Sequence, residues 1–242
     1  MSRMQSRTFA RVQKIIKRSR YGVTKLVNRY KDLVFDSFDF ENVINGLRRE
    51  FEDGVSVLDD FSIWLATSQN DLIRLLGGVL VEAYSTGLNR VFDQDGNKVS
   101  PSFEVGPSLI GDFIDRQGRF IRNISERETR RLRRDIALAR EQGKGFDDVR
   151  DGLLRSLKSR TRSQCERIGR SEIIALQGRA QMDLMSRNGV GRYTWIAALD
   201  RRTCETCRNL HRTTHRVGRG PKPVEDTHPN CRCVTVVARG EN

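Results

Sequence analysis

The sequence predicts an α+β fold that is predominantly helical, with long N-terminal and central helices and a small C-terminal β-containing unit closed by a Cys/His cluster of the zinc type. Three observations predict it. Charged residues make up 31% of the 242 residues and aromatic residues 7%, so the core must come largely from aliphatic faces of helices. Apolar residues keep a helical spacing over most of the chain, and β-prone runs appear only near its end. Four of the five cysteines lie between residues 204 and 233.

The charge of the chain is large and unevenly distributed. Lys and Arg number 44 against 31 Asp and Glu, which makes a polyanion such as nucleic acid the first partner to consider. Residues 1–33 hold ten basic residues and one acidic residue, whereas residues 34–116 hold six basic and fifteen acidic residues. We therefore expect a basic amphipathic arm (1–33), an acidic helical region (34–107) and a basic C-terminal domain (108–242).

The arm has the pattern of an amphipathic helix. Phe9, Val12, Ile15 and Ile16 recur at a spacing of three to four residues, and basic residues fill the positions between them. A charged helix face of this kind is either simply solvated or in contact with phosphates or an acidic partner. We expect the arm to bind double-stranded DNA without sequence preference through Arg7, Arg11, Lys14, Lys17, Arg18 and Arg20.

The acidic region predicts a pair of helices. The first runs from Phe40 to about Thr67, with Gly54 as a weak point, and the second begins at a Ser68 or Asn70 cap and reaches Val91. A stretch with Gly, Pro and Ser follows, up to Pro107, and marks a domain boundary. No membrane span is expected, because the longest uncharged apolar run, residues 75–81, is far shorter than the ~20 residues that a spanning helix needs.

Helices continue into the C-terminal domain. Residues 125–128 have the form of a capping box, which predicts a helix from there to Gln142, ended by residues 143–145. Two further helices are predicted over 147–157 and 162–186. Beyond these, β-prone runs occupy residues 193–199 and 234–237.

The cysteines form the strongest chemical signal. Two ligands separated by two residues can wrap one metal ion in a tight turn, and two such turns give the four N/S positions of tetrahedral zinc. The sequence contains Cys204-x-x-Cys207 and His228-x-x-Cys231, which predicts a structural zinc held by these four residues. Cys233 lies two residues beyond Cys231 on a predicted strand, so it is an alternative to His228. A redox Cys-x-x-Cys pair would not need the second cluster.

A closed set of four protein ligands leaves no position for water, so the metal would serve folding more than chemistry. The spacing of a zinc deaminase is absent from the sequence. The alternative is a metal-dependent hydrolase or nuclease of a small zinc-loop fold that uses His211, His215 or His228. Cys165 stands alone and is expected to be a packing residue.

An ordered series of motifs resembles the C-terminal domain of the phage Mu F-like head morphogenesis proteins, also called minor capsid proteins. The likeness extends from about Ser108 to Val237 and is carried by Arg170-Ser171-Glu172, Tyr193-Thr194-Trp195, the stretch from Asp200 to Cys207, and His228-Pro229-Asn230-Cys231-Arg232-Cys233.

The resemblance implies a virion protein present in few copies inside the capsid near the portal vertex, and in the host cytoplasm during assembly. It would contact the portal protein and other head proteins and act in head assembly and in DNA packaging or delivery. Glu172 and Asp200 match positions of the family motifs. We expect Glu172 to pair with arginines and Asp200 to cap a turn, not to catalyse hydrolysis.

Overall fold

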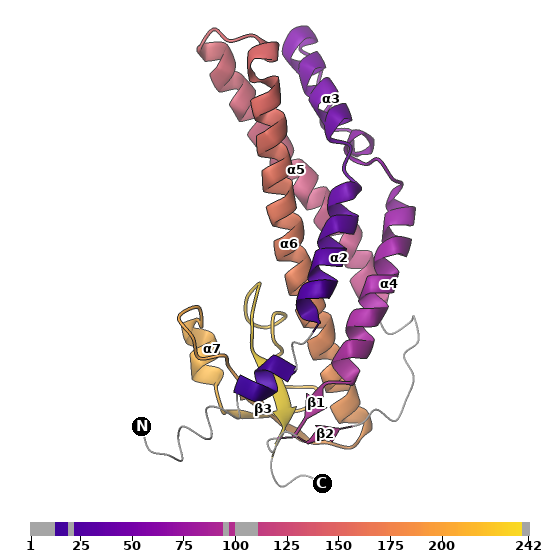
Figure 1. Ribbon diagram of the computed structural model, residues 1–242, viewed down its shortest axis with the longest axis vertical. Helices are drawn as coiled ribbons and strands as arrows, with labels where there is room; N and C mark the ends of the chain where they lie inside the picture. The colour runs from indigo at the N-terminus through magenta and orange to yellow at the C-terminus, as the bar shows by residue number, and fades with distance from the viewer. Residues whose placement is uncertain (1–12, 19–21, 94–96, 100–110, 239–242) are drawn as a thin grey trace. The chain divides into compact units, whose positions relative to one another are not determined.

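The computed structural model describes residues 13–18, 22–93, 97–99 and 111–238, which divide into two compact units (Figure 1). The helical unit contains residues 28–78 and 112–169. The sheet unit contains the rest of the described chain and includes the C-terminal region. Helices α2 (Val23–Asp36), α4 (Gln69–Leu88) and α6 (Phe146–Arg187) contribute residues to both units.

The predicted fold class is confirmed, because helices dominate the described chain and a small three-stranded antiparallel sheet lies with the Cys/His cluster towards the C-terminus. Each of the two units combines stretches that are far apart in the sequence. The expected division into three consecutive regions, with boundaries at residues 33 and 107, therefore stays a prediction. Among the described residues, no helix combines the length and apolar character that crossing a bilayer requires.

The helical unit is organised around buried aliphatic and aromatic side chains of α3 (Phe40–Asp53), the 3-10 helix η1 (Phe61–Trp64) and α5 (Gly111–Glu141). Trp64 is fully buried, and its indole N–H donates to the Leu58 carbonyl at 3.1 Å. Asn42 of α3 donates to the Ile63 carbonyl at 3.2 Å, which fixes η1 against α3.

The single helix expected from Phe40 to Thr67 is wrong. Helix α3 ends at Asp53, where Gly54 takes a left-handed conformation with φ of 71°, and the chain then turns into η1. Only glycine enters this region at little cost, so the residue expected to be a weak point is the helix terminus. The expected Ser68 cap is present, since its hydroxyl accepts from the Asp71 amide at 3.2 Å.

Two further helix boundaries expected from the sequence are also absent. Helix α5 passes through the expected capping box without a break: Ser125 donates to the Ile121 carbonyl, and buried Glu128 pairs with Arg131 and Arg160 instead of capping a helix. Helix α6 is likewise continuous across 157–162, a stretch without Gly or Pro. The predicted stops after α5 and α6 are confirmed, with φ near 70° at Gly143 and Gly189.

The sheet unit contains a three-stranded antiparallel sheet with strand order β4-β3-β5. Strand β3 (Arg192–Ile196) pairs with β5 (Val234–Val237) and β4 (Thr214–Arg216), and the short helix α7 (Glu205–Leu210) lies between β3 and β4 in the sequence. Both predicted β-runs therefore form strands. A second sheet of two short strands joins β1 (Val91–Phe92) to β2 (Lys98–Val99).

Residues 13–18 form a helical segment, here called the arm helix, that packs on the three-stranded sheet (Figure 1). Ile15 and Ile16 are buried in one cluster with Ile196, Val234 and Val236 of the strands. Gln13 adds a hydrogen bond from its side-chain amide to the Ala198 carbonyl at 3.0 Å. Residues 13–18 of the basic arm therefore belong to the sheet unit.

Candidate metal centre

The first ligand-bearing segment is the start of helix α7. Cys204 is the N-cap residue, and its sulfur accepts a hydrogen bond from the Cys207 amide at 3.3 Å. This N-cap brings the side chains of Cys204 and Cys207 to the same end of α7. Cys204 is half-buried and Cys207 is buried.

The second segment runs from His228 to Cys233 and leads directly into β5. Cys231 and Cys233 are buried, and His228 is half-buried. The backbone N–H of Asn230 donates to the Ser171 hydroxyl of α6 at 3.2 Å, and Asn230 has a φ of 62°. The local turn therefore depends on an unusual backbone conformation that α6 helps to hold.

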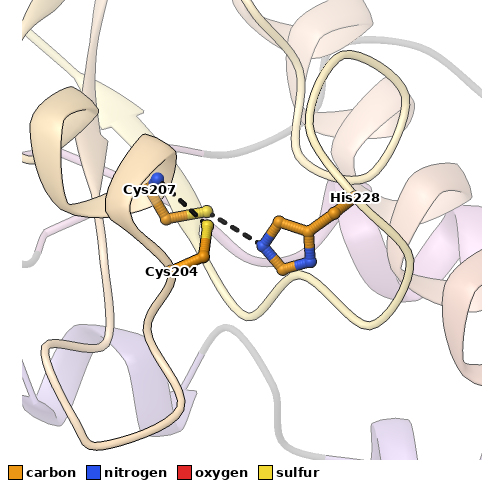
Figure 2. A group of neighbouring side chains, drawn as sticks. All are labelled: Cys204, Cys207 and His228. Carbon is orange, nitrogen blue, oxygen red and sulfur yellow. Dashed lines mark hydrogen bonds between the residues drawn. The ribbon is translucent and has the colours of Figure 1, made fainter.

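The two segments meet at Cys207. Its sulfur lies 3.2 Å from Nε2 of His228 and 3.7 Å from the sulfur of Cys231. Figure 2 shows Cys204, at the N-cap of α7, and Cys207, within α7, with His228 of the second segment facing them. Ligand atoms within 4.8 Å of one another form two overlapping groups that share Cys207: Cys204, Cys207 and His228, and Cys207, Cys231 and Cys233.

This donor set fits a metal ion. Two sulfurs that bind one tetrahedral zinc at ~2.3 Å stand about 3.8 Å apart, close to the Cys207–Cys231 separation of 3.7 Å. All five cysteines are free thiols, so none of the ligand atoms is committed to a disulfide. Of the four residues expected from the sequence, Cys204, Cys207 and His228 form one group, whereas Cys231 belongs to the other group with Cys207 and Cys233, which the sequence left as an alternative.

His228 is oriented as a ligand. Its Nδ1 lies 2.9 Å from the Pro229 carbonyl, which makes Nδ1 the protonated nitrogen and leaves Nε2 to face Cys207. A histidine that binds a metal usually has this arrangement, with the second ring nitrogen donating to a carbonyl or carboxylate. The hydrogen bond to Pro229 also raises the pKa of His228 above its ordinary value.

The neighbouring thiols stabilise a negative charge on the sulfur of Cys231. The hydrogen bond that Cys231 accepts from Cys233 lowers the pKa of Cys231 to about 4 despite its burial. Burial, together with the charge on Cys231, raises the pKa of Cys207 to about 12. Without a cation the cluster therefore favours a thiolate at Cys231, the form in which cysteine binds metals.

Asp200 and Arg232 tie the two segments together. Both guanidinium Nη atoms of Arg232, which lies between Cys231 and Cys233, contact the Asp200 carboxylate. Asp200 also accepts from the Arg202 amide at 2.9 Å and so caps the turn before Cys204, as expected. The hydrogen bonds from Arg232, outweighing a small effect of burial, hold the pKa of Asp200 far below its ordinary value.

The remaining histidines have structural partners. Nδ1 of His211 accepts from the Ala197 amide at 3.1 Å, and Nε2 of His215 lies 2.7 Å from the Thr213 hydroxyl. Neither belongs to a group of metal-binding side chains among the residues that the structure describes. Cys165 is completely buried in the helical unit, in agreement with a packing role.

The expected DNA-binding residues are only partly described. Lys14, Lys17 and Arg18 are exposed on the arm helix, whereas Arg7, Arg11 and Arg20 lie outside the described residues. Sequence reasoning missed that this helix is docked on the C-terminal sheet. It also missed the Asp200–Arg232 pair. The apolar pair Ile15 and Ile16 was the one signal in the arm that pointed to a docking surface.

Comparison with known proteins supports the likeness seen in the motifs. Residues 130–236 match the family described as Phage Mu protein F like protein. The match confirms the resemblance over the C-terminal region, and it includes all five candidate ligands as well as Asp200 and Arg232. Neither the curated proteins nor the solved structures gave a match to the chain.

Proposed function

We propose that this protein is a phage head morphogenesis protein, a minor capsid protein that acts without catalysis at the portal vertex inside the head. The observation that carries the proposal is the match of residues 130–236 to the Phage Mu F-like family, within which the whole Cys/His cluster falls. Its activity would be to support head assembly and the packaging or delivery of DNA.

The Cys/His centre would hold one structural zinc ion. Support comes from the donor set, in which thiolates and one imidazole nitrogen converge, and from the burial of three of the five donors. The ion would link α7 to the segment before β5, and His228, Cys204, Cys207 and Cys231 would supply its four ligands. A closed site of this kind stabilises a small β unit with few aromatic residues.

The proposed partners are the portal protein, other phage head proteins and double-stranded DNA bound without sequence preference. The excess of 44 basic over 31 acidic residues supports the interaction with DNA. The protein would be in the host cytoplasm during assembly and in the capsid interior, near the portal vertex, in the finished particle.

Locating the protein in purified particles tests the proposal. We expect a fusion with a small tag to appear by electron microscopy at a single vertex, in few copies per particle, and to remain associated with isolated portal complexes. A protein absent from particles, or distributed evenly over the shell, would contradict the proposal.

The absence of catalysis needs its own test. We expect about one tightly held zinc per chain and no cleavage of DNA by the purified protein. Cleavage that is lost in the His228→Ala variant, with metal content and folding measured in parallel, would instead favour a metal-dependent nuclease.

A further inference from the structure

The arm helix has two distinct faces. Ile15 and Ile16 are 4% and 7% exposed and pack on the sheet, whereas Lys14, Lys17 and Arg18 face solvent. Since the buried face fixes the helix on β3 and β5, the three cations are held at a defined place on the C-terminal region. They are not carried on an unattached tail.

The same face of the sheet carries two more cations. Side chains alternate along a strand, so Arg192, Thr194 and Ile196 of β3 point to one face, and it is the face that packs on the arm helix through Ile196. Arg216 of β4 is directly opposite Arg192 and shares its face. Both arginines are exposed.

Arg192 and Arg216 place two guanidinium groups opposite one another on the same face of the sheet. Guanidinium groups bind phosphate oxygens through two parallel hydrogen bonds. The arrangement is therefore suited to a phosphate ligand.

The excess charge of the whole chain belongs to this unit. Residues 28–78 and 112–169 contain 21 basic and 20 acidic residues, whereas the remaining residues contain 23 basic and 11 acidic residues. Many acids of the helical unit are already paired with its own arginines: Asp32 with Arg162, Glu41 with Arg150, and Glu50 and Asp59 with Arg133. The helical unit therefore has almost no net charge with which to attract a polyanion.

We propose that the cationic face formed by Lys14, Lys17, Arg18, Arg192 and Arg216 is the surface on which the protein docks the backbone of double-stranded DNA. The inference rests on the proposed function and assigns its DNA contact to one face of the sheet unit. The docked arm supplies three of the five cations, and the paired strands supply the other two.

An acidic protein surface is a weaker fit to this face. Protein interfaces are usually anchored by buried apolar or aromatic side chains. Of the exposed large hydrophobic residues among the described ones, Val55, Leu75 and Leu138 belong to the helical unit, and only Leu199, which follows Ala198, lies next to the arm helix. Exposed cations with a single large hydrophobic neighbour are more typical of contact with phosphates than of a protein interface.

Binding of a fluorescent random-sequence duplex of about 25 base pairs, followed by anisotropy between about 50 and 200 mM salt, tests the proposal. The face variant is Lys17→Gln, Arg18→Gln, Arg216→Gln. The matched control, Arg119→Gln, Arg134→Gln, Arg155→Gln, removes the same charge from exposed positions of α5 and α6. A third variant, Ile16→Asn, keeps every cation but removes an anchor of the arm helix. Circular dichroism checks that each variant folds.

We expect the face variant to bind at least about tenfold more weakly at low salt and to lose roughly two to three units of the slope of log K against log salt, because about 0.9 unit is lost per phosphate contact. The control should keep the wild-type slope, and Ile16→Asn should weaken binding with no change in charge. Equal losses in the face variant and the control would overturn the docking face but not the DNA-binding function.

Two other results also decide the matter. If the wild-type protein binds no DNA at any salt concentration, both the docking face and the DNA contact of the proposed function are wrong, while a portal-vertex location would still stand. If the face variant binds DNA as the control does but no longer copurifies with portal complexes, the face serves an acidic protein and the inference is overturned.

Discussion

Arg232 reaches from between two candidate metal ligands to hold the carboxylate of Asp200, which caps the turn leading to a third ligand. The pair connects the segment before α7 with the segment before β5, so it positions the two halves of the Cys/His cluster independently of any metal ion. The cluster is therefore partly organised by the protein itself.

Asp200→Asn should weaken the metal centre, because a neutral amide cannot form the two charged contacts with Arg232. We expect a loss of about 10- to 100-fold in metal affinity, as for other groups that support metal ligands without binding the ion. Competition with a chromophoric chelator measures the effect. Glu205→Gln, an exposed acid at the start of α7, is the matched control and should change the affinity by less than about twofold. Equal affinities for Asp200→Asn and wild type would contradict this role.

Removal of the metal should destabilise the C-terminal region. Since binding of a structural ion contributes directly to folding, we expect chelation to cost about 3 kcal/mol or more, or roughly 6–12 °C in Tm for a chain of this size. Cys231→Ser should reproduce the loss and release the bound metal, as seen by elemental analysis. Cys165→Ala, at a buried cysteine of the helical unit, should keep the metal. A Tm that chelation leaves unchanged would argue against a structural ion.

Gly87→Ala should destabilise the contact between α4 and α6 in the sheet unit. A Cβ at this position would lie 2.8 Å from both Cα and the carbonyl oxygen of Gln177, and backbone atoms cannot easily give way. We expect a loss of about 1–3 kcal/mol in urea unfolding. The control is Gly152→Ala, at an exposed site of α6 with nothing within 4 Å, where the higher helix propensity of alanine should stabilise by about 0.5–1 kcal/mol. Equal effects at both glycines would show that the close packing at Gly87 is unimportant.

Glu50→Gln should destabilise the helical unit in a pH-dependent way. Burial acts to raise the pKa of Glu50, but hydrogen bonds from Arg133 and from the Leu58 and Val57 amides outweigh it, so the net shift is downward. A carboxyl with a lowered pKa in the folded state stabilises the protein above its unfolded pKa of about 4.3, and the contribution is lost as the pH falls through the lower folded value.

We therefore expect Glu50→Gln to cost about 1–3 kcal/mol at pH 7 in urea unfolding and the difference from wild type to shrink steadily below about pH 4. Glu52→Gln removes a more exposed ion pair with Arg48 and should cost less than about 1 kcal/mol. A deficit for Glu50→Gln that is the same at pH 7 and pH 3 would mean that the ionised carboxylate is not the source of the stability.

Local signals in the sequence predicted much of this structure. The positions of Gly143 and Gly189 predicted helix ends because a left-handed residue ends a helix wherever it occurs. The ligand spacing of Cys204 and Cys207 predicted their convergence because a single turn of chain determines it. The capping-box pattern at residues 125–128 failed because such a pattern caps only where the preceding residues are not helical, and here α5 is already formed.

Contacts between distant residues could not be predicted in the same way. The docking of Ile15 and Ile16 on Val234 and Val236 depends on burial across more than two hundred residues, and an apolar pair within a basic segment does not specify its partner. The same is true of the Asp200–Arg232 pair, since a sequence rich in arginine offers that carboxylate many possible partners.

The docking of the arm helix also determines when this part of the protein can mature during synthesis. Ile15 is synthesised before the strand that covers it, which ends at Val237, more than two hundred residues further along the chain. At a rate of about 5–20 residues per second, the arm waits on the order of 10–40 seconds for its binding surface. A nascent chain should therefore expose the apolar side chains of Ile15 and Ile16 until β5 has been made.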